Sequence, residues 1–463
     1  MPWDRHRRAS IIILGSTGSV STVDQQDIIV IGAGAAGLMA AASLGRSKRS
    51  VLLLEARDRI GGRIWTRLEP QLAAPVELGA EFIHGDSPET SALLRQVGAA
   101  AVDISGEHWS LIGGRLLQRT ESLLGKVRAA FEEADVLSQP DSSLESFLTG
   151  GGGRTLPEEA RAMARAFVSG FDAADPRLVS LHSVAEEWRS GGMLDASQAR
   201  PLGGYRAALV ALSAALDSSR VRLQLQTVVN TVRWSDRSVE VEGDWLGQPF
   251  RAHARKAILT VPVGVLKAPA EAPGAIRFEP SLDAKQTALE HLLSGPVLKV
   301  VLHFRRPFWE ERDGGRYKDA SFFHAPGKVF PTFWSALPAR APLLNAWVGG
   351  PSAARLSELT DEQIVRQAMD CVSSVFPCGN ELPELQGAYV HNWARDPFAQ
   401  GAYSYLAAAG GNAREVLATP LGSTLFFAGE AADTTGEATT VTGALRSGAR
   451  AALEVSRHLD GPP

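Results

Sequence analysis

A glycine-rich turn between two apolar runs constrains this chain more than any other feature. The run DIIVIGAGAAGLMAAASL is followed by VLLLEARDRIGGR, and together they predict a strand, a turn, a helix and a second strand that ends at Glu55. Gly32, Gly34 and Gly37 have the Gly-x-Gly-x-x-Gly spacing, which permits a tight turn, close approach of the backbone to a pyrophosphate and close helix packing. Phosphates would lie at the helix N-terminus, where unpaired amides favour negative charge. Glu55 follows at about the 20-residue distance expected for the acid that binds a ribose hydroxyl, so the segment predicts a dinucleotide site.

Composition is typical of a globular protein with more than one domain. The chain has 463 residues, of which 44% are hydrophobic and 21% charged, and its formal net charge is −4. This length exceeds one compact core, and the scattered basic residues argue against nucleic-acid binding or a basic membrane surface as the main role. Cys371 and Cys378 lack a set of further cysteine or histidine ligands, so we expect neither a disulfide framework nor a metal site.

The first residues raise the question of targeting. Arg5, Arg7 and Arg8 precede a short apolar run at residues 11–14. The run is shorter than the 7 to 15 apolar residues of a usual signal core, and no clear small-x-small cleavage site follows it. We expect residues 1–24 to be an N-terminal extension of a cytoplasmic protein, with export through a twin-arginine signal as the alternative. No stretch approaches the ~18 apolar residues of a membrane span, so we expect none.

The next part of the chain alternates between helical and strand patterns. Residues 87–200 carry apolar side chains at helical spacings and predict a mostly helical insert, interrupted by glycines at 150–153. The run PLGGYRAALVALSAAL predicts another helix. It is followed by predicted strands in VRLQLQTVVNTVRW, SVEVEG and KAILTVPVGVL, the last of which ends at Pro262. We expect these strands to join the nucleotide-binding domain.

A second group of strands begins at PVLKVVLHF. The following region is rich in aromatic and β-branched residues, which predicts a second, antiparallel sheet, and a helix is expected over residues 361–375. The stretch STLFFAGEAADTTGEATTVTGALRSGARAALEV predicts a strand, a loop and a long amphipathic helix. The sequence has no internal repeat.

Motifs distributed along the chain resemble those of the flavin-dependent amine oxidases, a family that includes monoamine, polyamine and spermine oxidases and the lysine-specific histone demethylases. GAGAAGL, LEARDRIGGR, PVELGAEFIHG, PLGGY, TVPVGVLK, KVVLHF, GAYSY, and LFFAGE with TTVTGA occur in the family's order. The resemblance implies an α/β fold, with a doubly wound Rossmann-like FAD-binding domain assembled from residues 25–86, 201–290 and 388–463. A second, α+β domain with a mixed sheet and helices would bind substrate and comprise residues 87–200 and 291–387.

The resemblance also implies which residues hold FAD. Glu55 and Arg63 are similar to the ribose and pyrophosphate contacts, Val229 to the residue that meets the adenine, and Val441 to the one near the flavin ring. The full expected set is Gly32, Gly34, Gly37, Glu55, Arg57, Gly61, Gly62, Arg63, Gly79, Ala80, Val229, Pro262, Gly429, Glu430 and Val441. Ala402 stands where monoamine oxidases carry the cysteine that attaches the flavin, so we expect FAD to be bound noncovalently.

The expected catalytic residues are Lys299, Tyr403 and Thr440. In polyamine oxidases and demethylases, a lysine at a position similar to Lys299 holds a water at the reactive flavin nitrogen and assists reoxidation by oxygen. A lysine inside PVLKVVLHF is otherwise costly to bury, and the alternative is an edge-strand lysine that points to solvent. Tyr403 and Thr440 match the two residues between which substrate amines pass, and an aromatic face there contributes about 0.5 to 2 kcal/mol of cation–π attraction.

The segment GAEFIHG supplies the expected substrate contacts Glu81, Phe82 and His84, and Trp393 is expected to form a wall of the flavin pocket. Polyamine oxidases resemble this segment and use the position of His84 to meet a distal amine. A carboxylate at Glu81 in an enclosed cavity would attract a polycation. The alternatives are that Glu81 bonds local backbone and that His84 and Trp393 are packed core side chains.

The sequence therefore predicts an FAD-dependent oxidase of a polyamine or related secondary amine. The amine would become an imine that hydrolyses to an aldehyde and an amine, with O2 reduced to hydrogen peroxide. The expected partners are a small amine and O2, without nucleic acid or membrane.

Other classes remain as alternatives. Amino-acid oxidases grip a carboxylate with an arginine at a place comparable to Phe82, so that class would need an arginine from elsewhere, such as Arg305 or Arg316. Ala402 and Thr440 weaken monoamine oxidation, and the absence of a long helical tower weakens histone demethylation. A binding or assembly protein that keeps FAD as a structural element is the non-enzyme alternative.

Overall fold

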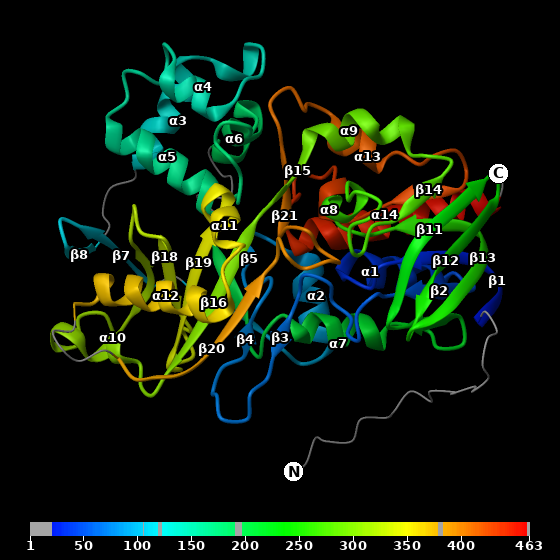
Figure 1. Ribbon diagram of the computed structural model, residues 1–463, viewed down its shortest axis with the longest axis horizontal. Coiled ribbons are helices and arrows are strands. Elements are labelled where there is room, and N and C mark those ends of the chain that lie inside the picture. The colour runs from blue at the N-terminus through cyan, green and yellow to red at the C-terminus, as the bar shows by residue number, and fades with distance from the viewer. Residues whose placement is uncertain (1–20, 105, 119–122, 190–196, 378–382, 461–463) are drawn as a thin grey trace.

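The computed structural model describes residues 21–104, 106–118, 123–189, 197–377 and 383–460. Figure 1 shows two bodies side by side, each built around its own sheet. The arginines at positions 5, 7 and 8, on which the export alternative depends, lie outside the described residues. The first strand, β1 (Ser21–Ile31), begins before residue 24, where we expected the N-terminal extension to end.

The first body is built on a largely parallel sheet. In spatial order its strands are β10 (Val221–Gln224), β2 (Val51–Leu54), β1, β13 (Gln248–Leu259), β12 (Ser238–Trp245), β11 (Thr227–Ser235) and β14 (Arg277–Glu279), with β22 (Leu425–Phe427) beside β13. β10, β2, β1, β13 and β22 run parallel, whereas β12 is antiparallel to both of its neighbours. All four residues of β2 are buried, as a parallel strand between two helix layers requires.

Helices cover both faces of this sheet. Ile28 and Val30 of β1 pack with α1 (Ala35–Arg46), α7 (Arg206–Ala214) and α14 (Val441–Asp460). Ile29 and Ile31 belong to a second core that includes α9 (Gln286–His291) and α13 (Ala413–Ala418). Because successive strand side chains point to opposite faces, one strand contributes to both cores. The doubly wound fold class predicted from the sequence is confirmed.

The second body contains a mostly antiparallel sheet. Its spatial order is β20 (Leu385–Asn392), β16 (Val297–Phe304), β19 (Leu343–Gly349), β18 (Thr332–Ser335), β17 (Ala320–His324), β7 (Glu107–Ile112) and β8 (Arg115–Gln118). Only the pairing of β7 with β17 is parallel among these described strands. Helix α12 (Asp361–Val375) has the predicted bounds and begins at a capping box formed by Thr360 and Gln363.

The expectation of a mostly helical insert over residues 87–200 is only partly right. Its helices are α2 (Pro88–Gln96), α3 (Leu123–Glu133), α4 (Leu144–Thr149), α5 (Glu158–Gly170) and α6 (Leu181–Trp188), but β6 (Ala101–Asp103), β7, β8 and β9 (Gln198–Pro201) are strands. β7 and β8 form a hairpin whose turn contains Gly113 and Gly114, both with positive φ. The pairing of β7 with the distant β17 extends the second sheet, and this long-range contact is absent from the local sequence pattern.

Short elements complete the two bodies. β3 (Thr66–Arg67) pairs with β4 (Val76–Glu77), β5 (Ile83–His84) pairs with β9, and β15 (Leu292–Gly295) pairs with β21 (Tyr403–Leu406). The remaining helices are α8 (Val263–Leu266), α10 (Phe308–Glu311) and α11 (Gly350–Leu356), with 3₁₀ turns at Val136–Ser138, Asp283–Lys285, Arg312–Gly314 and Glu430–Ala432. The domain boundary expected at residue 388 falls inside β20, which pairs with β16 and therefore lies in the second sheet.

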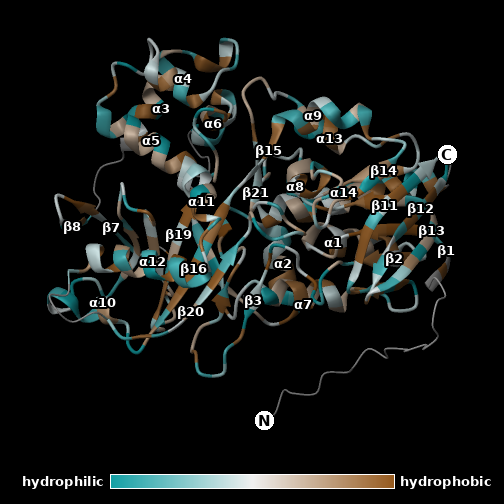
Figure 2. Cartoon of the chain, in the orientation of Figure 1, coloured by the Kyte–Doolittle hydropathy of each residue, from teal (hydrophilic) through white to brown (hydrophobic). Residues whose placement is uncertain are grey.

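Hydropathy follows this architecture. In Figure 2 the hydrophobic colour is concentrated in the strands and the inward sides of the helices, and hydrophilic colour appears on outward-facing helix surfaces such as that of α12. Within the part of the chain that the structure describes, no helix is long and apolar enough to cross a bilayer.

Candidate active site

One large cavity, of about 1220 Å³, is lined by residues of both bodies. The first sheet contributes the ends of β1, β2 and β11 and the residues that follow β13, and the second body contributes residues of β16, β17 and β18. Every site residue predicted from the sequence lines this cavity except Gly37, which lies directly behind its wall. The structure therefore brings together residues that are spread over most of the chain.

The glycine turn forms a narrow cradle at one end of the cavity. Gly32 has a φ of 106°, a conformation that residues with a Cβ rarely adopt, and a Cβ added at Gly37 would lie 1.9 Å from the carbonyl oxygen of Gly32. Gly34 precedes α1 without a side-chain cap, so backbone amides of the first helical turn face the cavity. Glu55 accepts hydrogen bonds from the backbone N–H of Ala33 at 2.8 Å and of Arg57 at 3.0 Å, which fixes its carboxylate beside the turn.

A second glycine pair brings another loop onto this cradle. Gly61 and Gly62 have φ values of 104° and 57°, and Gly61 forms a parallel bridge with Gly34. A Cβ at Gly79 would lie 1.9 Å from the carbonyl oxygen of Arg63. These close approaches leave a channel bounded by backbone rather than by side chains, which is the shape that an extended diphosphate requires.

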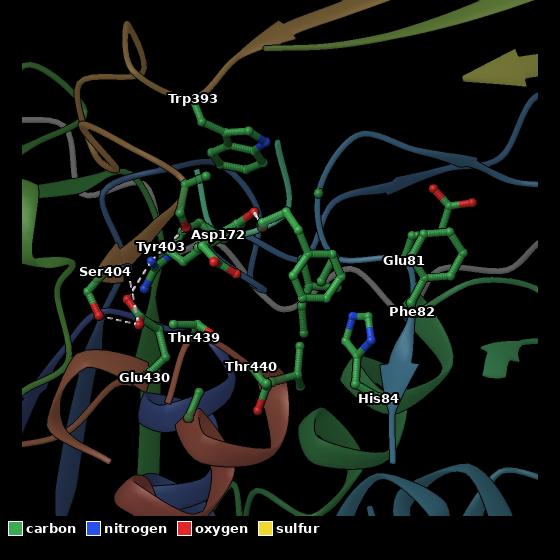
Figure 3. A pocket seen from close by; sticks show the side chains of 18 of the residues that line it. Glu81, Phe82, His84, Asp172, Trp393, Tyr403, Ser404, Glu430, Thr439 and Thr440 are labelled. Carbon is green, nitrogen blue, oxygen red and sulfur yellow. Dashed lines mark hydrogen bonds and ion pairs between the residues drawn. The ribbon is translucent and has the colours of Figure 1, made fainter. Parts of the chain in front are cut away.

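Charged groups line the cavity next to this channel. Glu430 is 4% exposed and accepts hydrogen bonds from Arg63 Nη1 at 2.8 Å and from Ser404 Oγ at 2.7 Å. Arg414, which was not predicted from the sequence, donates to Ser404 Oγ at 2.8 Å. Burial alone would raise the pKa of Glu430, but Arg63 and Arg414 lower it below its ordinary value. One guanidinium pairs with Glu430 directly and the other reaches it through Ser404, whose hydrogen bond to Glu430 is drawn in Figure 3.

The other predicted cofactor residues lie around the same space. Val229 on β11 is 5% exposed, Pro262 precedes α8, Gly429 has a φ of 126°, and Val441 begins α14. Arg57 lines the cavity and forms an ion pair with Asp396.

Lys299 is buried, not exposed at a sheet edge. It lies with 0% exposure on β16, which is paired on both sides, with β19 and β20, and its Nζ is 2.6 Å from Glu81 Oε2. The ammonium is also 5.1 Å from the ring centroid of Trp334. The alternative of a solvent-facing lysine is therefore wrong.

Glu81 is neutralised inside the wall of the cavity. Besides Lys299, it meets Arg200 Nη2 at 2.7 Å and accepts a hydrogen bond from Trp334 Nε1 at 3.0 Å. Burial alone would raise the pKa of Glu81, but Lys299 and Arg200 lower it. In Figure 3 the side chains of Glu81 and His84 are directed apart. Two internal cations therefore already pair with Glu81, and its expected contact with a substrate cation stays a prediction.

Phe82 and His84 form an aromatic wall. The ring of Phe82 packs 5.6 Å from that of Trp334, and the ring of His84 packs 5.5 Å from that of Phe171. Burial lowers the pKa of His84 to about 4, so the imidazole is neutral at pH 7. Within the described residues, its Nδ1 has no hydrogen-bond partner, which leaves a polar atom available to a ligand.

The side chains of the three remaining predicted residues, Tyr403, Trp393 and Thr440, are each held by hydrogen bonds. Tyr403 donates its hydroxyl hydrogen bond to the carbonyl of Phe171, which holds the ring on the cavity wall. Trp393 is 2% exposed and donates from Nε1 to the carbonyl of Leu78 at 3.0 Å. Thr440 donates to the carbonyl of Glu437 and accepts from the N–H of Gly443, so its hydroxyl caps α14 and only the rest of its side chain faces the cavity.

Two carboxyl groups that sequence analysis missed also line the cavity. Asp172 follows α5, and Glu187 lies in the last turn of α6, next to Trp188. Figure 3 shows Asp172 on the side of Tyr403, across from Phe82 and His84. The signal available for Glu187 was its place on the helix face that also carries the buried Val184, because an acid on a buried helix face is uncommon.

The family model for flavin containing amine oxidoreductase matches residues 35–456, which is most of the chain and includes Glu55, Asp172 and Glu187. The chain belongs to this family. The members' cofactor is a flavin, and the glycine channel, Glu55 and the Arg63–Glu430–Arg414 cluster fit FAD. When bound, FAD would take a hydride equivalent from the carbon beside the amine nitrogen.

Related proteins support the same assignment. The chain is 30% identical over 474 residues to polyamine oxidase 5 of Oryza sativa subsp. japonica, covering 93% of this chain and 88% of that protein. It is 29% identical over 462 residues to human lysine-specific histone demethylase 2, covering 93% of this chain and 53% of that protein. The chain thus spans about half the length of that demethylase.

Solved structures show the same fold. Cyclohexylamine oxidase from Brevibacterium oxydans IH-35A superposes with a TM-score of 0.77 at 22% identity, over 94% of this chain and 100% of that chain. A putrescine oxidase bound to putrescine superposes with a TM-score of 0.74 at 23% identity, over 94% and 100% of the two chains.

Proposed function

We propose that the chain oxidises a polyamine or a related secondary amine that carries a further positive charge, using noncovalently bound FAD and O2. The amine becomes an imine that hydrolyses to an aldehyde and an amine, and O2 becomes hydrogen peroxide. Membership of the amine oxidoreductase family and the likeness to plant polyamine oxidases support this proposal.

The observation that carries the choice of substrate is the pair of carboxyl groups at Asp172 and Glu187. Glu81 and Glu430 also line the cavity, but each is held by two cations. Among the described residues, no lysine or arginine pairs with Asp172 or Glu187. Each of these two residues also has a buried carboxyl oxygen without a hydrogen-bond partner there. A multiply charged amine supplies the N–H donors and the positive charge that these oxygens lack.

The two arginines that the sequence offered to an amino-acid oxidase lie outside the cavity. The described residues that line the cavity include neither Arg305 nor Arg316. Arg305 pairs with Glu384 on the surface, and Arg316 stacks 5.0 Å from the ring of Trp109, so neither can grip a substrate carboxylate there. Ala402 offers the flavin no thiol, which supports noncovalent binding.

The test is an anaerobic absorbance titration of the purified yellow protein. Its panel contains spermine, spermidine, N-acetylspermine, benzylamine, a methylated lysine peptide and several amino acids. We expect the polyamines to bleach the flavin and to yield hydrogen peroxide when air is admitted. Bleaching by amino acids or benzylamine alone would overturn the proposed substrate class, and bound FAD that no amine bleaches would favour the non-enzyme alternative.

A further inference from the structure

Amine oxidation needs a group that accepts a proton from the substrate nitrogen. A secondary amine is a cation at neutral pH, and its nitrogen must lose a proton before its lone pair can assist departure of a hydride equivalent from the neighbouring carbon. The acceptor must contact the cavity, must have an unoccupied lone pair, and must not be held by an internal cation.

The candidates in the cavity can be compared directly. Lys299 donates from Nζ to Glu81 Oε2 and is paired with that carboxylate. The Tyr403 hydroxyl donates to Phe171, and burial together with Asp172, Glu187 and Glu430 raises its pKa well above the ordinary value. His84 is neutral with a free Nδ1, but burial lowers its pKa to about 4, which makes it a weak base. Glu107, His108, Asp319 and His324 also line the cavity, but they belong to β7, β17 and the residue before β17 in the second body. Beside Tyr403, Asp172 and Glu187 remain.

The geometry of this pair suits proton exchange. Asp172 and Glu187 are half-buried, and both line the cavity. Asp172 Oδ2 and Glu187 Oε1 are each buried without a hydrogen-bond partner in the part of the chain that the structure describes. The adjoining Ala173 is fully buried with a φ of 52°, an uncommon backbone conformation for alanine.

Electrostatics keep one proton on the pair. Burial and the facing Glu187 raise the pKa of Asp172, and burial also raises that of Glu187. The facing groups from neighbouring elements are Tyr403 on β21, which is neutral, and Glu430 behind it, which is held by arginines. Two neighbouring carboxyls that face each other share one proton and one negative charge, and the ionised member retains a lone pair.

We propose that the Asp172–Glu187 pair accepts the ammonium proton of the substrate. This inference rests on the proposed function. One N–H bond of the substrate breaks and one O–H bond forms on the ionised carboxyl, which converts the ammonium and the singly protonated pair into a neutral amine and a doubly protonated pair. The amine then loses a hydride equivalent, two electrons with a hydrogen, to FAD as the oxidant, and leaves as an iminium cation.

The test follows the rate of anaerobic flavin reduction against pH, using an amine that bleaches the wild-type flavin. Single variants Asp172→Asn and Glu187→Gln and the double variant keep the shape of each side chain and remove its charge. We expect the double variant to reduce its flavin roughly 100-fold more slowly at neutral pH. Its rate should rise about tenfold per pH unit, because only substrate that is already neutral in solution can then react.

Glu186→Gln is the matched control, since Glu186 is the exposed neighbour on the same helix and does not line the cavity. It should keep the wild-type pH profile. FAD content and thermal unfolding of each variant, measured on the same samples, show whether it is folded and loaded.

The single variants give an independent check. Each single variant should shift the pH at which the rate of flavin reduction falls on the acid side, because the remaining carboxyl loses its partner's charge. A double variant that is loaded with FAD and retains the wild-type rate and acid limb would overturn the inference while leaving the proposed function intact. A His84→Asn variant that by itself removes the fall in rate at acid pH would also overturn the inference. Failure of every amine to reduce the wild-type flavin would instead overturn the proposed function.

Discussion

The two ends of the cavity are built in different ways. The cofactor end is made mostly of backbone, with glycines at fixed spacing along short stretches of chain and one carboxylate, Glu55, tied to backbone amides. The substrate end is made of side chains that come from separate helices and strands, including Asp172, His84 and Tyr403. Backbone geometry is set by local sequence, whereas side-chain chambers are set by tertiary packing. We therefore expect few substitutions to be tolerated at the cofactor end and more to be tolerated at the substrate end.

The largest expected effect comes from a substitution that blocks the cofactor end of the cavity. Gly37→Ala places a Cβ 1.9 Å from the carbonyl oxygen of Gly32, and only a backbone shift can relieve that contact. We expect a protein that retains almost no FAD, as measured by absorbance per chain. Gly151→Ala is the control, because nothing lies within 4 Å of a Cβ there, and it should load normally. Full FAD occupancy in Gly37→Ala would contradict the claim that backbone contact defines this end.

The second prediction concerns the wall between the two ends. Glu81→Gln leaves Lys299, with 0% exposure, without its anionic partner, and it should lower the free energy of unfolding by about 3–5 kcal/mol. Adding Lys299→Met should recover part of that loss, which denaturant unfolding of the FAD-loaded proteins would measure. Glu69→Gln, in a surface pair with Arg67, should cost less than about 1 kcal/mol. Equal losses in the single and double variants would contradict the coupling.

The same carboxylate gives a pH dependence with a defined sign. Because Lys299 and Arg200 lower the pKa of Glu81 in the folded protein, its contribution to stability is present above its unfolded pKa. It is lost as the pH falls through the lowered folded pKa. Acid unfolding of Glu81→Gln should therefore be shallower than that of the wild type between these two values.

A smaller effect is expected when a positive charge is removed from the cofactor end without adding a steric clash. Arg414→Met removes one of the two guanidiniums beside Glu430, and we expect the FAD dissociation constant to rise about tenfold, equivalent to about 1.4 kcal/mol. Fluorescence titration of the apoprotein measures this constant. Arg206→Met, on the exposed side of α7, should leave it unchanged. An unchanged constant for Arg414→Met would remove this arginine from the cofactor site.

The smallest expected effect lies at the substrate end. Thr440→Val removes the hydroxyl that caps α14 and should cost about 1 kcal/mol in thermal unfolding. Thr440→Ser keeps the cap and should cost less. A large loss of flavin reduction in Thr440→Ser with unchanged stability would show that Thr440 acts on the substrate through its methyl group as well as on the helix.

The sequence predicted the cofactor end far better than the substrate end. Gly32, Gly34 and Glu55 lie where their spacing placed them, because the strand, turn and helix that carry them are local. Local patterns also predicted α12 to its end residues. They did not predict β7, which pairs with the distant β17, or β8, which pairs with β7.

At the substrate end, motif position identified residues but not their partners. Glu81 was correctly placed at the cavity, but its neutralisation depends on Arg200 and Lys299, which are far from it in sequence. Asp172 and Glu187 belong to none of the motifs on which the resemblance rests, and their contact depends on how α5 and α6 pack. Such juxtapositions are properties of the fold and are not encoded in local spacing.

The most direct test of the account measures FAD content and anaerobic flavin reduction on the same samples of the wild type and of the Asp172→Asn, Glu187→Gln double variant, with a polyamine that bleaches the wild type. The account predicts full FAD content in both and a reduction rate roughly 100-fold lower in the double variant at neutral pH. Loss of FAD from the double variant with an unchanged reduction rate per bound flavin would contradict the division of the cavity into a cofactor end and a substrate end.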